Sequence, residues 1–139
     1  MTHIEHLGIA VADLDQSIPL FEALLGTSVY KIETVESEQV RTAFLQSGPN
    51  KIELLEPTGH ESPIAKSLEK RGAGMHHVAF AVQDIEAELS RLKAMGFQLL
   101  NEQPKKGADG KLVAFVHPKS AGGVLVELCM DDPEASKTV

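Results

Sequence analysis

An internal repeat constrains the fold of this 139-residue chain more than any other feature. Residues 6–14 read HLGIAVADL and residues 77–85 read HVAFAVQDI, so His, Ala, Val and Asp recur at an offset of 71 positions. Phe44 and Phe115 share that offset, and Glu53 and Glu127 recur at an offset of 74. Self-similarity at a fixed period indicates a duplicated supersecondary unit. We therefore predict two copies of one small module that share a core.

Each half follows the pattern strand–helix–strand–strand–strand. Asp13 and Asp84 are typical helix N-caps, and Gly26 and Gly96 are typical residues at helix ends. The expected helices follow these aspartates. The expected strands cover residues 3–11, 28–34, 39–46 and 51–56 in the first half, and residues 76–82, 97–102, 112–117 and 123–130 in the second.

A short connector helix is expected between the halves. Ser62 can act as its N-cap, Pro63 suits its first position, and Gly72 can end it. The chain then forms one domain, residues 1–139, with module 1 at about 3–58, the connector at about 62–71 and module 2 at about 75–130. The C-terminal segment 131–139 is expected to be solvated.

Composition excludes several function classes. The formal net charge of −7 argues against broad binding of nucleic acid, which depends on neutralising phosphates. Apolar runs stay well short of the ~20 residues that a membrane helix needs. One cysteine, Cys129, cannot form an internal disulfide, and we interpret it as a small buried residue. A cytoplasmic protein that binds neither nucleic acid nor membrane is therefore expected.

The histidines at the start of each repeat lie on an unusual strand face. Side chains alternate across a strand, so His6 shares its face with Gly8 and Ala10, while Leu7, Ile9 and Val11 take the other. In the second copy, His77, Ala79 and Ala81 share one face, and Val78, Phe80 and Val82 share the other. The same alternation turns His76 away from His77. The face with one histidine and small residues leaves room for a ligand.

Two glutamates lie on the less apolar faces of the last strand of each half. Glu53 lies between Ile52 and Leu54, and Glu127 lies between Val126 and Leu128. A carboxylate is costly to bury without a partner, so each one needs either solvent or a cation. We therefore predict a metal site formed by His6, Glu53, His77 and Glu127.

This donor set narrows the choice of ion. Two imidazoles and two carboxylates suit a divalent first-row ion such as Mn, Co, Ni, Fe or Zn. The cysteine count excludes a thiolate zinc site, and a fourth protein ligand disfavours the 2-His-1-carboxylate dioxygenases. An octahedral ion held by four side chains would keep two positions for oxygen ligands.

Four segments resemble the methylmalonyl-CoA epimerase family of the vicinal oxygen chelate, or glyoxalase-like, superfamily. They read HLGIAVADLD, KIELLEP, ESPIAKSLEKRGAGMHHVAFAV and HPKSAGGVLVEL. The resemblance implies an α+β fold in which two tandem βαβββ modules form one cupped mixed sheet around a metal site. It implies epimerisation at C2 of methylmalonyl-CoA, a homodimer, and an ion that is usually Co²⁺, with Mn²⁺, Ni²⁺ or Zn²⁺ as other candidates. By motif match the ligands are again His6, Glu53, His77 and Glu127.

One departure from the family affects the catalytic bases. Some members carry Gln at the position of Glu53 and a separate catalytic Glu on the third strand, where this chain has Thr42. A threonine hydroxyl is far too weak a base for this step. We therefore assign Glu53 and Glu127 as the two bases on opposite faces of C2, acting as displaceable ligands. If that scheme fails, Glu36 and Glu38 are the next candidates.

Contacts to the substrate are less constrained by the sequence. Lys105, Lys106 and Lys119 lie in loops of the second half, and we predict that they bind the phosphates of CoA. Gln39, Arg41 and Gln46 are candidate contacts for the substrate carboxylate. Two alternatives remain open: a glyoxalase I-type isomerase acting on a glutathione hemithioacetal, and a module that binds a small molecule without catalysis.

The ligand prediction can be tested by substitution. Replacing His6 or His77 with Ala should remove the bound divalent ion and the activity while the protein stays folded. Metal analysis of the purified variants, with circular dichroism as the folding control, measures this. His76→Ala should retain the ion, because alternation turns that side chain away. Full metal occupancy in His77→Ala would contradict the assignment.

Overall fold

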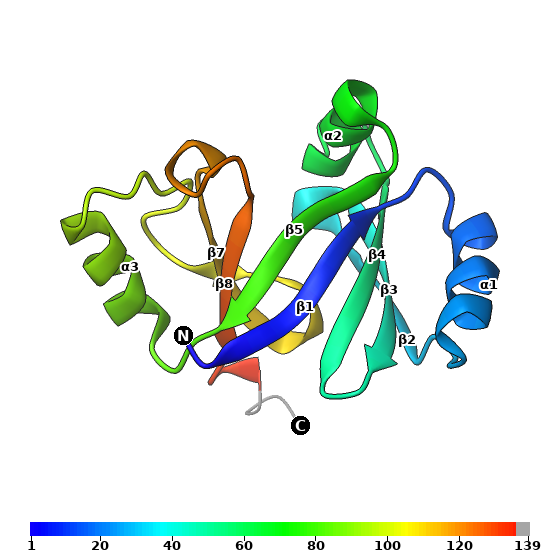
Figure 1. The fold of residues 1–139 in the computed structure, drawn as a ribbon, viewed down its shortest axis with the longest axis horizontal. Helices are drawn as coiled ribbons and strands as arrows, with labels where there is room; N and C mark the ends of the chain where they lie inside the picture. Colours follow the sequence, from blue (N-terminus) through cyan, green and yellow to red (C-terminus); the bar gives the residue numbers. More distant parts are fainter. Residues whose placement is uncertain (136–139) are drawn as a thin grey trace. The chain divides into compact units, whose positions relative to one another are not determined.

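The computed structural model describes residues 1–135 as eight strands, three α-helices and three short 3₁₀ helices (Figure 1). The N-terminal elements are β1 (His3–Ala10), α1 (Leu14–Leu25), β2 (Lys31–Val35), η1 (Glu36–Glu38), β3 (Val40–Ser47), β4 (Asn50–Pro57) and α2 (Pro63–Arg71). They are followed by β5 (Gly74–Ala81), α3 (Ile85–Ala94), β6 (Lys105–Lys106), η2 (Ala108–Gly110), β7 (Lys111–Val116), η3 (Pro118–Ser120) and β8 (Val126–Asp131).

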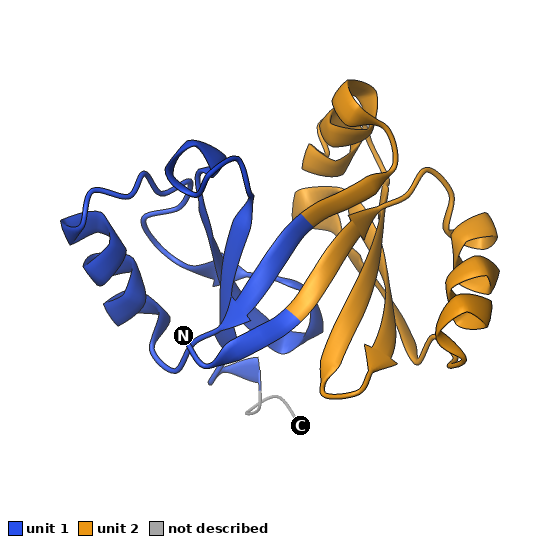
Figure 2. Cartoon of the chain, in the orientation of Figure 1, with its two compact units in different colours: residues 1–5, 77–139 blue, residues 6–76 orange. Residues whose placement is uncertain are grey.

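The chain divides into two compact units, which Figure 2 shows in different colours. Unit 1 comprises Met1–Glu5 and His77–Val139, and unit 2 comprises His6–His76. The first residues join unit 1 because Thr2 contacts the end of β5: its N–H and its hydroxyl both donate to the carbonyl of Ala81, at 2.8 and 3.1 Å. The N-terminal strand thus begins in one unit and continues in the other.

Unit 2 contains a mixed sheet in the strand order β2-β3-β4-β1. β1 and β4 are parallel, and the other pairs are antiparallel hairpin neighbours. α1 packs on the face formed by alternate residues of these strands (Figure 1). The buried residues of this core are Val11, Leu14, Ala43, Leu45 and Leu54. As predicted, Asp13 caps α1 and Gly26 ends it in the left-handed conformation that glycine adopts readily.

Unit 1 repeats the same arrangement in the order β5-β8-β7-β6. β5 and β8 are parallel, whereas β8, β7 and β6 pair antiparallel. α3 covers one face of β7 and β8, with its first turn capped by Asp84. The buried core beneath it consists of Val82, Ile85, Leu89, Leu92, Ala114, Val116 and Leu128. The predicted duplication of a βαβββ module is thereby confirmed.

One predicted strand is wrong. Residues 97–102 form no strand, and the short β6 lies at Lys105–Lys106 instead. Leu99 makes only an isolated bridge to Val116, and the Asn101 side chain accepts the N–H of Phe115 at 3.0 Å. The side-chain oxygen of Asn101 thus accepts a β7 N–H that a neighbouring backbone strand would otherwise have bonded. Pro104, which has no N–H, then precedes β6.

The predicted connector helix is present as α2, capped by Ser62 and beginning with Pro63. Ile64 and Leu68 pack against Ala10, Val40 and Leu55. Alternation places Ala10 on the strand face of His6, and Leu55 on that of Glu53. α2 therefore covers one end of the face that carries the predicted ligands of unit 2, so it does more than connect the modules.

The C-terminal segment is only partly solvated. Asp132 is buried, and its N–H donates to the carbonyl of Gly110 at 2.9 Å. Residues 136–139 lie outside the described part of the chain. Among residues 1–135, no helix is long and apolar enough to cross a membrane.

The core of unit 2 provides a stability test. Leu14, the first residue of α1, is 0% exposed, whereas Leu24 on the same helix is 72% exposed. Leu14→Ala should lower the free energy of unfolding by about 2–5 kcal/mol, because it leaves a cavity. Leu24→Ala, the matched control, should change it by less than about 0.5 kcal/mol. Urea denaturation measures both, and equal losses would contradict the placement of α1.

Candidate metal centre

Unit 2 brings His6 and Glu53 together. β1 and β4 are parallel with Gly8 opposite Glu53, so the imidazole and the carboxylate project from the same face. The Nδ1 atom of His6 lies 3.2 Å from Oε2 of Glu53, and the two side chains are 4% and 8% exposed. The predicted ligands of this module are therefore adjacent and buried.

Unit 1 contains the equivalent pair. β5 and β8 are parallel with Ala79 opposite Glu127, which again places histidine and glutamate on one face. The Nε2 atom of His77 lies 3.3 Å from Oε1 of Glu127, and the side chains are 6% and 8% exposed. Each predicted histidine is thus beside the carboxylate that the repeat assigns to it.

The geometry of each pair fits a divalent ion. Two donors that each lie about 2.1 Å from one ion, at angles of about 90–110°, are separated by roughly 3.0–3.4 Å. The nitrogen–oxygen distances of 3.2 and 3.3 Å fall within that interval. Imidazole nitrogen and carboxylate oxygen are both donors for first-row divalent ions. Each unit therefore carries a buried His–Glu pair that is suited to two neighbouring coordination positions.

An aromatic ring flanks each pair. Phe44 is paired with Glu53 across β3 and β4, and Phe115 is paired with Glu127 across β7 and β8. The ring of Phe115 meets His77 edge-on, with centroids 6.0 Å apart and an interplanar angle of 86°. The two phenylalanines hold equivalent places in the repeat, so the apolar surroundings of the ligands are duplicated together with the ligands.

The sequence-based reading overlooked Lys51. This lysine is buried, and its Nζ lies 3.8 Å from Oε2 of Glu53. Its Nζ also lies 5.6 Å from the centroid of the Phe44 ring. The signal was present in the sequence, because in the segment KIE alternation places Lys51 on the face of Glu53. Lysine is seldom buried, and only the structure shows that Lys51 is.

The three lysines predicted to bind CoA lie in different surroundings. Lys105 Nζ stands over the Phe115 ring, 5.8 Å from its centroid. Lys106 is exposed and pairs with Asp132 at 3.8 Å. Lys119 is exposed in η3, and its N–H donates to Nδ1 of His117. Lys106 pairs with Leu112 near the start of β7, whereas Lys119 follows the end of that strand. Within unit 1 they form no single basic patch.

His76 lies in a different environment from His77. It is half-buried in unit 2, and burial together with the charge of Arg71 lowers its pKa from 6.5 to about 4. The imidazole of His76 is therefore neutral at pH 7. Two consecutive histidines thus belong to different units and differ in burial.

The other candidates on and near β3 have mostly structural contacts. Thr42 is buried on the face of Phe44. Arg41 pairs with Glu56 at 3.7 Å, and the Gln46 amide donates to the carbonyls of Gly48 and Asn50 in the hairpin. Gln39 occupies the left-handed region with φ of 50°, and its side chain fills the space in which a Cβ of Gly59 would stand. Glu36 and Glu38 form part of η1.

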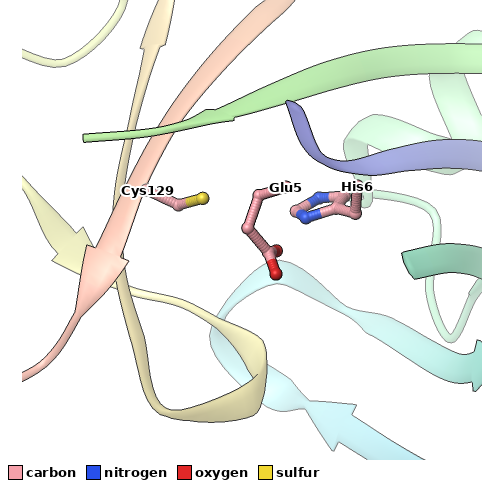
Figure 3. Close-up of side chains that lie close together, drawn as sticks. All are labelled: Glu5, His6 and Cys129. Carbon is pink, nitrogen blue, oxygen red and sulfur yellow. The ribbon is translucent and has the colours of Figure 1, made fainter. Parts of the chain in front are cut away.

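Cys129 is buried in unit 1, as predicted. Its thiol donates to the carbonyl of Phe80 at 3.6 Å and packs with Ala79 and Val113. Its sulfur points toward Glu5, and the carboxylate of Glu5 lies within 4.8 Å of it (Figure 3). Packing and this thiol hydrogen bond account for the residue without a role as a ligand.

Comparisons with known protein families and sequences show which proteins this chain is similar to. The family model described as Glyoxalase/Bleomycin resistance protein/Dioxygenase superfamily matches residues 5–115. The chain is 42% identical over 126 residues to the mitochondrial methylmalonyl-CoA epimerase of Homo sapiens, covering 90% of this chain and 72% of that protein. It is also 42% identical over 127 residues to the ethylmalonyl-CoA/methylmalonyl-CoA epimerase of Cereibacter sphaeroides, covering 90% and 95%.

A solved structure is similar over nearly the whole chain. A variant of Streptomyces coelicolor methylmalonyl-CoA epimerase, in complex with 2-nitronate-propionyl-CoA, superposes with a TM-score of 0.90. It shares 37% identity, and the match covers 96% of each chain. Together with the two βαβββ modules, this likeness confirms the predicted glyoxalase-like fold.

The role of Cys129 can be tested directly. Cys129→Ala should leave the content of divalent ion unchanged, because we assign no coordinating role to the sulfur. It should lower the free energy of unfolding by roughly 1–2 kcal/mol, since a buried group is removed. Metal analysis and urea denaturation measure the two effects. Loss of the ion with little change in stability would make Cys129 a ligand.

Proposed function

Because the chain belongs to the methylmalonyl-CoA epimerase family of the glyoxalase/bleomycin resistance protein/dioxygenase superfamily, we propose that it interconverts the two C2 epimers of methylmalonyl-CoA. It is an enzyme of the isomerase class. The observation that carries the proposal is the duplicated His–Glu contact, buried and at equivalent repeat positions in both units. A family member that only binds a small molecule would not need this donor set.

The proposed cofactor is one divalent ion held by His6, Glu53, His77 and Glu127. The fit of each pair to neighbouring coordination positions supports this set, as does the low exposure of all four side chains. When bound, the ion supplies Lewis-acid stabilisation of the negative charge that develops on the substrate oxygens. Co²⁺ is our first choice, and Mn²⁺, Ni²⁺ and Zn²⁺ suit the same donors.

The proton on C2 is the reacting group. It lies between a thioester and a carboxylate, so its removal gives an enolate with a planar C2 atom. Inversion requires one base to take the proton from one face and a protonated group to return a proton to the other. The net change is the configuration of C2, and no oxidant or other co-reactant is consumed.

We assign these two roles to Glu53 and Glu127. Each carboxylate touches a histidine of its own unit and is paired with a phenylalanine on the neighbouring strand. In one direction Glu53 takes the proton while protonated Glu127 returns one, and in the other direction the roles reverse. The equivalence of the two positions in the repeat supports the assignment to opposite faces of C2.

The remaining proposals concern the substrate's CoA portion and the assembly. Lys105, Lys106 and Lys119 are proposed to bind the CoA phosphates. Lys105 has the strongest support, because it stacks on the ring that contacts His77. A homodimer and a cytoplasmic location remain predictions from the family resemblance and the single cysteine.

Isotope exchange on each purified epimer tests the mechanism. Glu53→Gln should keep its ion, since the amide still offers an oxygen. It should exchange the C2 proton of one epimer with D₂O while inverting that centre at least ~100-fold more slowly than the wild type. Glu127→Gln should show the mirror behaviour with the other epimer. Nuclear magnetic resonance follows exchange and inversion, with metal content measured in parallel.

The wild-type protein with and without a chelator is the control for this experiment. The untreated protein should incorporate deuterium at C2 and invert it, and the chelated protein should do neither. Full activity after verified metal removal would overturn the metal proposal. Near wild-type epimerisation by metal-loaded Glu53→Gln would overturn the two-glutamate scheme and direct attention to Glu36 and Glu38. Activity on a glutathione hemithioacetal alone would favour the glyoxalase I alternative.

A further inference from the structure

A lysine is buried beside one of the two His–Glu pairs. Lys51 follows the first residue of β4, directly opposite His6 on β1, and only 6% of it is exposed. Lysine is almost never buried unless its ammonium group is paired. Its burial therefore needs an explanation in the contacts of that group.

The ammonium group of Lys51 and the imidazole of His6 contact the same carboxylate oxygen. Oε2 of Glu53 lies 3.2 Å from Nδ1 of His6 and 3.8 Å from Nζ of Lys51. The Nζ atom of Lys51 also lies over the Phe44 ring, 5.6 Å from its centroid. Lys51 thus lies against the oxygen that faces His6, in the position of a residue that orients a ligand from outside the coordination sphere.

The second module has no lysine at the position equivalent to Lys51. The residue equivalent to Lys51, two positions before Glu127, is Leu125, which carries no charge. At this strand position the first module therefore has an ammonium group and the second has an aliphatic side chain.

We propose that Lys51 is a positioning residue that holds the Glu53 carboxylate in the orientation required for metal binding. This inference rests on the metal site of the proposed function. Lys51 contacts Glu53, and an ammonium group cannot coordinate a metal ion, so it would act through Glu53. The ammonium also offsets one of the two carboxylate charges in the centre, which leaves the loaded site with net positive charge toward an anionic acyl group.

Cobalt titration of the metal-free protein tests this role. Lys51→Met has a side chain of similar length, and it should weaken Co²⁺ binding by roughly 10- to 100-fold, as loss of an orienting contact does elsewhere. Lys51→Gln should show a loss in the same range and serves as a second variant should Lys51→Met fold poorly. Lys51→Arg, which restores a cation, should recover a large part of the affinity. Calorimetry gives the dissociation constants, and the visible absorption of bound Co²⁺ reports on the ligand geometry.

Lys31→Met is the matched control. Lys31 places its Nζ 5.4 Å from the centroid of the same Phe44 ring, but its ion pair is with Glu33, at 3.2 Å. Like Lys51→Met, this variant removes one positive charge and one ammonium group over the Phe44 ring, but it leaves the contact with Glu53 intact. Its Co²⁺ affinity should therefore stay within about twofold of the wild type. Thermal unfolding of all metal-free variants separates loss of binding from loss of folding.

A double-mutant cycle with Glu53→Gln shows whether Lys51 acts through Glu53. In the Glu53→Gln background, Lys51→Met should weaken Co²⁺ binding by less than about threefold, because the two residues share one contact. Wild-type affinity in folded Lys51→Met or Lys51→Gln, or an undiminished loss in the Glu53→Gln background, would overturn the inference. Failure of the metal proposal itself is distinguishable, since the wild-type protein would then bind no Co²⁺.

Discussion

The structure depends on the parallel pairing of the first and last strands of each module. β1 lies beside β4 in unit 2, and β5 lies beside β8 in unit 1. In a parallel pair, residues on matching faces stand side by side, so one histidine and one glutamate meet without any contribution from a loop. Because the site residues are on strands within the sheet, their positions are held by the backbone ladder, and rigid elements support precise coordination.

Burial of these groups has an energetic cost that the surrounding residues reduce. A carboxylate buried without a partner is strongly unfavourable, and here each one contacts an imidazole. In unit 2, α2 packs on the ligand-bearing face at Ala10 and Leu55, and Phe44 and Lys51 flank Glu53. The cation that compensates buried carboxylates in the working enzyme is proposed to be the metal ion, which links ligand binding to the stability of both modules.

In the proposed mechanism, the duplication provides one carboxylate for each face of the C2 atom. Each module supplies a carboxylate, a histidine and a phenylalanine in the same strand relation. The copies differ two positions before the carboxylate, where the first has Lys51 and the second has Leu125.

The sequence by itself determined the repeat, the faces of the strands and both aspartate caps. These are local properties, since alternation and capping depend only on neighbouring residues. The tertiary structure decided the burial of Lys51, the grouping of Met1–Glu5 with unit 1, and the replacement of a strand at 97–102 by the short β6. Each depends on how strands pair in the folded sheet: Lys51 lies opposite His6 only because β1 pairs with β4, and Asn101 takes the N–H of Phe115 only when β7 lies beside it.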